Sequence, residues 1–284
     1  MTGTGTQNDP YIVDNTADFL EAVAQSGVYV QLGSDIDVAA DGYEYIGTVT
    51  VNALSINGNG FAIRNATFQP GISDVCFLIG NTNIEWKDIS FLDCSVKPRA
   101  ADVTFFYGDQ CSYSGMKLSL QVQPLSGFYL FSDQANASNC AADITMNGGA
   151  ILISFHKGSL SNSTFFIRGT YSFNKTIQGY SGSPAKQVNN VGIVFGGNPL
   201  AGTVYLGNYA NFVGCYFAFA DSVSIPDGGT LDVLLGQYST SGQNVVFSVG
   251  NVVSGSVTTP SNFPRLTTAQ MKDKAYLQSI GWLP

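Results

Sequence analysis

The sequence predicts an all-β chain built as a single right-handed parallel β-helix, and three observations favour this fold class. Hydrophobic residues make up 44% of the 284 residues and charged residues only 11%, whereas ordinary globular domains carry about 25% charged residues. Period-two alternation of apolar and polar residues dominates the middle of the chain. Short strand patterns also recur there without helical patterns between them, which is typical of a solenoid.

The alternation is clearest in three segments, residues 116–122, 142–146 and 245–249. In each one every second residue is apolar, and the residues between them are polar, apart from Val246 in the third segment. Because successive side chains of a strand point to opposite faces, one face of each strand is expected in the core and the other in water.

The strands recur in a loose repeat. The apolar strand FLIG begins at Phe77, and its counterparts FFYG, YLFS, LISF and IVFG begin at positions 105, 129, 152 and 193. The first three intervals are similar to one another, and the last, before IVFG, is much longer. A second strand follows each one: KDISFLD, MKLSLQV, ADITMNG, STFFIRG and CYFAFAD. We expect these strands to stack as coils about 4.8 Å apart.

An antiparallel β-sandwich or jelly roll is the alternative architecture. It would need hairpin turns, and the candidates are Asn57-Gly58, Asn59-Gly60 and Asn147-Gly148. These are few for so many predicted strands, so the parallel β-helix is favoured.

Helical patterns are confined to the two ends of the chain. We therefore expect three parts: an N-terminal arm with a capping helix (1–46), the β-helix (47–255) and a C-terminal capping or docking segment (256–284). The first helix is expected over residues 16–25, with Thr16 as its cap and Gly27 as its stop. Phe19, Leu20 and Val23 form its apolar face and should cover the first coil. Covering the end of a solenoid prevents end-to-end aggregation.

The C-terminal helix is expected over residues 267–279. Its segment is too apolar for a free tail, so it should dock on the last coil or on a partner subunit. The residues expected to make that contact are Met271, Tyr276, Leu277 and Trp282.

Charge and cysteine usage argue against several kinds of function. The net charge is −8, and only 12 Lys and Arg residues are scattered along the chain, so nucleic-acid binding is not expected. No apolar run reaches the roughly 18 residues of a membrane span, and the N-terminus does not read as a signal peptide. The five cysteines form no CxxC pair and His156 is the only histidine, so we expect buried free thiols, no metal site and no cofactor.

Two segments carry a resemblance to known families. The opening GTGTQNDPYIV, followed by a short helix and a strand ending in DIDV (Asp35 to Val38), resembles the entry of bacterial surface adhesin-type and phage β-helix proteins. The closing segment 267–282, with Gln270, Met271, Asp273 and then Gly281-Trp282, resembles the end of GLUG-type repeat proteins. The resemblance is confined to these two ends of the chain and implies β-helix caps, not an activity.

The enzyme alternative is a polysaccharide-degrading β-helix, either a glycoside hydrolase or a lyase. Polygalacturonases, which share the expected fold, use N-T-D, D-D, G-H-G and R-x-K motifs. This chain has Asn81-Thr82-Asn83 without the carboxylate and lacks the other three motifs. If the second strands align, Asp88, Lys117 and Asp143 would stack on successive coils. A lysine between two acids would lower the pKa of both, whereas a general acid needs a raised pKa. No catalytic residue is predicted.

The favoured function is therefore non-enzymatic. We expect a phage virion protein, a spike, tail fibre, head fibre or head-decoration protein, which presents a β-helix surface for attachment or assembly. Its expected partners are other virion proteins, a host surface glycan or protein, and copies of itself in a homotrimer.

The long interval before IVFG places extra chain in residues 171–190, and long loops on rigid scaffolds often carry recognition residues. The candidate ligand contacts in that loop are Tyr171, Lys175, Tyr180 and Lys186.

Overall fold

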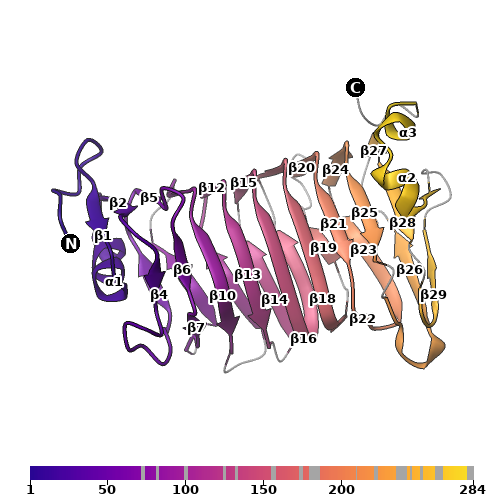
Figure 1. The fold of residues 1–284 in the computed structure, drawn as a ribbon, viewed down its shortest axis with the longest axis horizontal. Helices are drawn as coiled ribbons and strands as arrows, with labels where there is room; N and C mark the ends of the chain where they lie inside the picture. The colour runs from indigo at the N-terminus through magenta and orange to yellow at the C-terminus, as the bar shows by residue number, and fades with distance from the viewer. Residues whose placement is uncertain are drawn as a thin grey trace.

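The structure is a computed structural model that describes fifteen stretches of the chain. They are residues 1–71, 74–80, 83–98, 102–123, 126–131, 134–154, 158–172, 175–178, 186–208, 210–220, 223–234, 242–243, 245–249, 252–259 and 265–279. Strands account for most of them, and every pairing between named strands is parallel. The chain winds as a β-solenoid whose long axis runs from the N-terminal to the C-terminal end (Figure 1). The predicted fold class, a single parallel β-helix with short helices at both ends, is confirmed.

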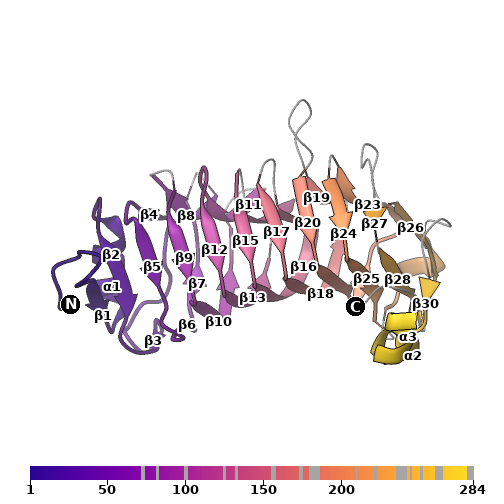
Figure 2. The ribbon, with the colours of Figure 1, turned by 90° about the horizontal axis from the view of Figure 1, so that it is seen from above.

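One side of the solenoid is a sheet of ten short strands, here called sheet A, which lie side by side along the long axis (Figure 2). Its strands are β1 (Tyr11–Val13), β2 (Tyr29–Leu32), β5 (Ser55–Asn57), β9 (Glu85–Lys87), β12 (Ser112–Ser114), β15 (Asn136–Ser138), β17 (Ser159–Ser161), β20 (Lys186–Asn189), β24 (Ala210–Val213) and β27 (Gly242–Gln243).

The other strands form one large sheet with two ladders. Ladder B contains β3 (Ile36–Asp37), β6 (Ala62–Arg64), β7 (Thr67–Phe68), β10 (Ser90–Val96), β13 (Lys117–Val122), the first part of β16 (Ala141–Ser154), β18 (Thr164–Ser172), β21 (Gly192–Phe195), β22 (Asn198–Pro199), β25 (Tyr216–Phe219), β28 (Val246–Val249) and β30 (Arg265–Leu266). Ladder C contains β4 (Val49–Val51), β8 (Val75–Ile79), β11 (Asp102–Tyr107), β14 (Gly127–Phe131), the last part of β16, β19 (Lys175–Gln178), β23 (Gly202–Asn208), β26 (Thr230–Leu234) and β29 (Ser256–Thr258). A short 3₁₀ turn, η1 (Pro226–Gly228), precedes β26.

The strand register corrects one part of the predicted repeat. The FLIG, FFYG, YLFS and LISF strands do stack in ladder C, as expected. IVFG does not belong to that series, because Ile193 pairs with Phe165 and Phe217 in ladder B. The next strand of ladder C is β19, where Ile177 pairs with Ser154. The number of residues in this coil therefore does not exceed that of the coils before it. The long interval before IVFG therefore came from aligning strands of two different ladders.

The ladders also extend beyond the limits expected for the β-helix. β1, β2 and β3, all before residue 47, pair in register with later strands. β29 and β30, after residue 255, continue ladders C and B. The two end segments are thus parts of the solenoid that also carry its helices.

A left-handed residue turns the chain from sheet A into ladder B in successive coils. These residues have φ between 47° and 64°, and they are Asp88, Gly115, Asn139, Asn162, Asn190 and Gly214. The N–H of each of the first five donates to a sheet A carbonyl of the next coil, as from Asn139 to Ser161 at 3.1 Å. Gly, Asn and Asp tolerate this backbone conformation better than other residues do. Side chains also join neighbouring corners, since Asn190 Nδ2 donates to Asn162 Oδ1 at 3.1 Å.

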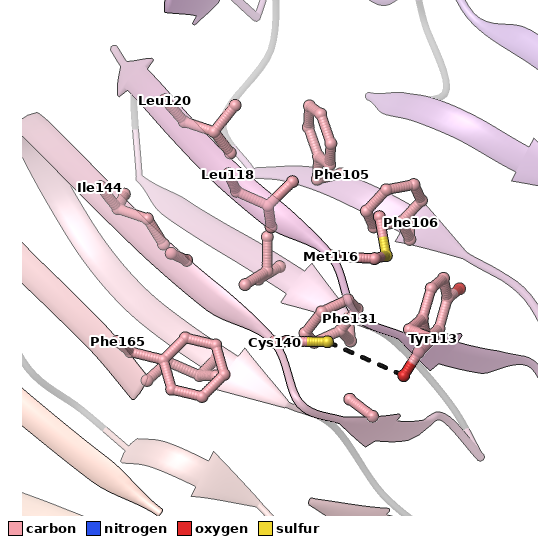
Figure 3. Close-up of a cluster of buried hydrophobic side chains, with 14 of the residues drawn as sticks. Phe105, Phe106, Tyr113, Met116, Leu118, Leu120, Phe131, Cys140, Ile144 and Phe165 are labelled. Atoms are coloured by element: carbon pink, nitrogen blue, oxygen red, sulfur yellow. Dashed lines mark hydrogen bonds between the residues drawn. The ribbon is translucent and has the colours of Figure 1, made fainter. Parts of the chain in front are cut away.

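The inward side chains of the three strand series fill one continuous core. Phe77, Phe106 and Phe131 occupy equivalent positions of ladder C, and their rings stack at centroid distances of 5.3 and 5.9 Å. Figure 3 shows Phe106 and Phe131 next to Tyr113 from sheet A. The alternating residues predicted for 116–122 and 142–146 point into the same core, as expected. Such aromatic contacts add to the free energy gained by burial.

The N-terminal end of the core is covered by α1 (Thr16–Ala24). Phe19 and Val23 are buried and Leu20 packs against the core, as predicted. Phe19 and Leu20 share a small apolar cavity with Phe68 and Phe77, so the helix covers the first coils. The cap differs from the prediction, because the Asn15 side chain accepts the N–H of Asp18. Thr16 instead donates its N–H and hydroxyl to Asp41 at 2.6 and 2.7 Å.

The C-terminal helical pattern forms two short helices, α2 (Thr268–Lys272) and α3 (Lys274–Ser279), with Asp273 between them. Thr267 caps α2 through a reciprocal capping box with Gln270. Leu277 forms a second apolar cluster with Val246 of β28 and Leu266 of β30. The helices therefore pack on the outside of ladder B, not across the end of the coils (Figure 1). None of the helices in the described stretches is long and apolar enough to cross a membrane.

The five cysteines are free and buried, as the sequence predicted. Cys140 and Cys215 directly follow the left-handed corner residues, and their thiols donate to backbone carbonyls. Burial raises the pKa of Cys94 to about 12 and the pKa of Cys111 and Cys215 to about 11.

We expect these thiols to resist alkylation while the protein is folded. The thiolate is the reactive form, and both burial and the raised pKa values suppress it at pH 8. Native protein should take up less than one equivalent of iodoacetamide per chain in an hour, and protein unfolded in guanidinium should take up five. Intact-mass spectrometry counts the adducts. Rapid labelling of the native chain would contradict the buried placement.

Candidate functional site

The outer face of ladder B over β16, β18, β21 and β25 carries a group of partly exposed side chains that point away from the core. On β18, Phe166 and Arg168 point outward and alternate with Phe165 and Ile167, which are buried. Register places Phe166 beside Asp143 of the preceding coil and Val194 of the following coil. We call this surface the binding face and define it by Asp143, Phe166, Arg168, Val194 and Tyr216.

Arg168 is held in place by two neighbours. Its Nη2 donates to Asp143 Oδ2, and the two side chains keep exposed fractions of 46% and 45%. Its guanidinium carbon lies 4.5 Å from the centre of the Phe166 ring. A guanidinium above a ring makes a favourable cation–π contact. The pair is too exposed to contribute much to stability, so its main physical effect is to fix the orientation of the guanidinium.

Two glycines allow aromatic rings to lie close to β21. A side-chain carbon at Gly192 would fall 2.0 Å from the Tyr216 ring, which therefore covers this glycine. At the other end of the strand, a side-chain carbon at Gly196 would lie 3.4 Å from the Phe166 ring. Val194 is the outward residue between the two glycines. The binding face thus consists of Val194 between two rings, with the Arg168–Asp143 pair at one side.

Of the candidate ligand contacts predicted from the sequence, the three that the structure describes lie on strands of three different series, β18, β19 and β20. Tyr171 is fully buried, and its hydroxyl donates to the Gly196 carbonyl at 2.9 Å. An exposed role for this ring is therefore wrong. Lys175 lies on β19 of ladder C and Lys186 on β20 of sheet A, where their backbones pair with Tyr205 and Ala210. Tyr180 and His156 lie outside the described residues.

Most of the predicted docking residues contact this chain itself. Met271 and Tyr276 are partly buried and pack with Leu277 against the last coils, where Tyr216 of the binding face joins the same cluster. Trp282 lies outside the described residues. The binding face is therefore continuous with the surface that α2 and α3 cover.

The stack expected of Asp88, Lys117 and Asp143 does not form. Asp88 is a left-handed corner residue before β10, whereas Lys117 pairs with Ser90 and Ala141. Asp143 pairs with Ser119 one coil earlier and reaches Arg168 one coil later. The sequence alone shows no acidic neighbour for Arg168, because its partner lies one whole coil back in the chain.

Several other carboxylates have structural roles near the N-terminal end. Hydrogen bonding from the backbone N–H of Ala62, and then from Arg64, lowers the pKa of Asp35. Hydrogen bonds from the Ala40 backbone and the Asn65 side chain lower the pKa of Asp37. Within the described residues, no three His, Cys, Asp or Glu side chains are grouped in a way that could hold a metal ion.

Asp35 should make stability depend on pH in the acid range. Its folded pKa lies below the ordinary value of 3.8. Its contribution is therefore fully present above that value and is lost as the pH falls through the lower, folded pKa. Asp35→Asn should lower the urea midpoint at pH 7 and show a smaller further drop between pH 5 and pH 2 than the wild type. Arg64→Ala, which keeps the Ala62 hydrogen bond, should show a smaller effect at pH 7. Identical pH profiles for wild type and Asp35→Asn would contradict the assignment.

Comparison with known proteins supports the fold and no more. No protein-family profile matches the chain, and no curated protein is significantly similar in sequence. A solved structure described as a "putative immunoglobulin A1 protease from Bacteroides ovatus" superposes with a TM-score of 0.54. The match covers 98% of this chain and 89% of that one, with 15% sequence identity. At this level of identity the likeness concerns the β-helix alone.

Proposed function

We propose that this chain is a non-enzymatic virion protein of a phage, a spike, fibre or head-decoration component that presents its β-helix for attachment or assembly. The observation that carries the proposal is the binding face. It is a patch of partly exposed aromatic, aliphatic and paired charged side chains held on rigid, paired strands. Sites built on strands hold their side chains more rigidly than sites built on loops.

The carboxylates described above also favour binding over hydrolysis. A glycosidase needs a carboxyl group whose pKa is raised so that it can act as general acid. Hydrogen-bond donors lower the pKa of Asp35 and Asp37. The N-terminal amine of Met1 donates to the Asp18 carboxylate and lowers its pKa in the same way. Asp143 is engaged by Arg168. These groups therefore suit structural and contact roles.

The proposal places the protein in assembled particles, with other virion proteins and copies of itself as partners. A homotrimer of 30.1 kDa chains is the expected assembly. Light scattering after size exclusion measures the mass of the isolated protein, and a trimer should have three times the mass of the chain.

Immunogold labelling and peptide counting of purified particles test the proposed location. The protein should be present at a fixed copy number per particle. A parallel incubation of the purified protein with host polysaccharide, followed by a reducing-sugar assay, tests the enzyme alternative. Absence from particles together with steady release of reducing ends would overturn the proposal in favour of that alternative.

A further inference from the structure

The binding face has the chemistry of a site for an uncharged saccharide, and we propose that it binds a neutral oligosaccharide. This inference rests on the proposed function, because it names the ligand that a receptor-binding surface of this kind would take.

Charge sets the class of ligand. Arg168 and Asp143 form an ion pair, so the charged side of the face carries a donor and an acceptor but no net charge. A free carboxylate or phosphate would be attracted by Arg168 but repelled by Asp143. A cation would be attracted by Asp143 but repelled by Arg168. A sugar hydroxyl donates and accepts at the same time. Two neighbouring hydroxyls can therefore contact the guanidinium and the carboxylate together without separating the pair.

The apolar part of the face suits the C–H side of a sugar ring. Val194 lies between the Phe166 and Tyr216 rings, which lie against the glycines at positions 196 and 192. All three side chains are partly exposed. A small apolar surface beside paired polar groups is the usual composition of a small-ligand site. Because Arg168 is already oriented by Phe166 and Asp143, little side-chain entropy would be lost on binding.

Outward polar side chains extend the site to neighbouring coils. Thr145 pairs with Arg168 in register, and Gln121 lies one coil further towards the N-terminus. Thr164 and Thr170 flank Phe166 and Arg168 on β18. Since successive coils are about 4.8 Å apart, these groups would contact sugar residues that follow one another along the solenoid axis. The expected ligand is therefore an oligosaccharide that lies across several coils.

The test uses the whole purified protein and a glycan array that carries neutral gluco-, galacto-, manno- and N-acetylated oligosaccharides beside uronic-acid oligosaccharides. We expect retention on neutral glycans only. The best neutral oligosaccharide is then titrated by calorimetry. Arg168→Ala should weaken its binding by about tenfold or more, which is the effect of losing a charge-assisted hydrogen bond. Val194→Glu, which places a carboxylate in the apolar centre, should abolish it.

Arg64→Ala is the matched control. Arg64 forms an ion pair with Asp35 at nearly the same exposure, 39% and 45%, but lies outside the binding face. This variant should bind within about twofold of the wild type. Circular dichroism confirms that each variant is folded. The inference is overturned if no neutral glycan is retained, if only uronic-acid glycans are retained, or if Arg168→Ala binds as Arg64→Ala does. Each of these results leaves the particle-labelling experiment, and hence the proposed function, unaffected.

Discussion

Phe77→Ala should destabilise the protein by about 3–5 kcal/mol, the usual cost of removing a large aromatic side chain from a packed core. Phe77 is 1% exposed. Its ring centre lies within 5.5 Å of those of Phe68, Phe91, Phe105 and Phe106, as well as Trp86. The substitution leaves a void lined by rings of the same coil and of the following coil, and stacked strands cannot easily close it.

The effect should first appear at the N-terminal coils, because each coil of a solenoid contacts only its neighbours. The ring centre of Trp86 lies 5.3 Å from that of Phe77, so the fluorescence of Trp86 reports on this region. Urea unfolding followed by tryptophan fluorescence should therefore show a large shift in midpoint. Tyr107→Ala is the matched control, since Tyr107 is 43% exposed on the strand that pairs with Phe77. Its substitution should change stability by no more than about 0.5 kcal/mol. Equal shifts for the two variants would contradict the placement of Phe77.

The sequence was sufficient for the fold class because alternation is a direct consequence of strand geometry. Leu118, Leu120 and Val122 are buried where the pattern put them, since every second side chain of a strand faces the same side. The capping face of α1 could be predicted for the same reason, from the helical period. Neither inference needed knowledge of contacts distant in sequence.

The alignment of coils was harder to predict, because a solenoid tolerates coils of unequal length. FLIG and IVFG look alike as apolar strands followed by glycine, yet they occupy different ladders. The left-handed corners would have been a better guide, since Asn139, Asn162 and Asn190 mark the same point of three successive coils. In sequence they are hidden among many other asparagines of the chain.

The binding face was missed for a related reason. Arg168 and Asp143 meet only because they occupy neighbouring coils, and the Tyr216 ring lies over Gly192 of the coil between Arg168 and Tyr216. Once the coils are aligned, the three residues fall on one outward face of ladder B. The buried position of Tyr171 follows from the same alignment, since its segment continues β18 and is not part of an inserted loop. The described residues within 171–190 lie mostly on β18, β19 and β20, so the interpretation of this range as one loop does not hold for them.

Gly169→Ala should be the most disruptive small substitution on ladder B. Gly169 has φ of +90°, and a side-chain carbon there would lie 2.0 Å from the carbonyl oxygen of Met146 on the paired strand β16. An alanine would suffer the strain of a positive φ, about 1–2 kcal/mol, and a backbone clash that no side-chain rotation relieves. Overpacking of this kind typically adds about 1–3 kcal/mol. β16 and β18 must then separate, which strains the hydrogen bonds that hold Arg168 near Asp143.

Gly60→Ala separates the two contributions. Gly60 has φ of +84°, but a side-chain carbon there would meet nothing within 4 Å. This variant should therefore show only the conformational strain, about 1–2 kcal/mol, whereas Gly169→Ala should lose about 1–3 kcal/mol more. Urea midpoints measured at several protein concentrations give both values and detect aggregation. If the two variants were equally stable, the close approach of β16 and β18 at Gly169 would be wrong, and with it the rigid support under Arg168 and Phe166.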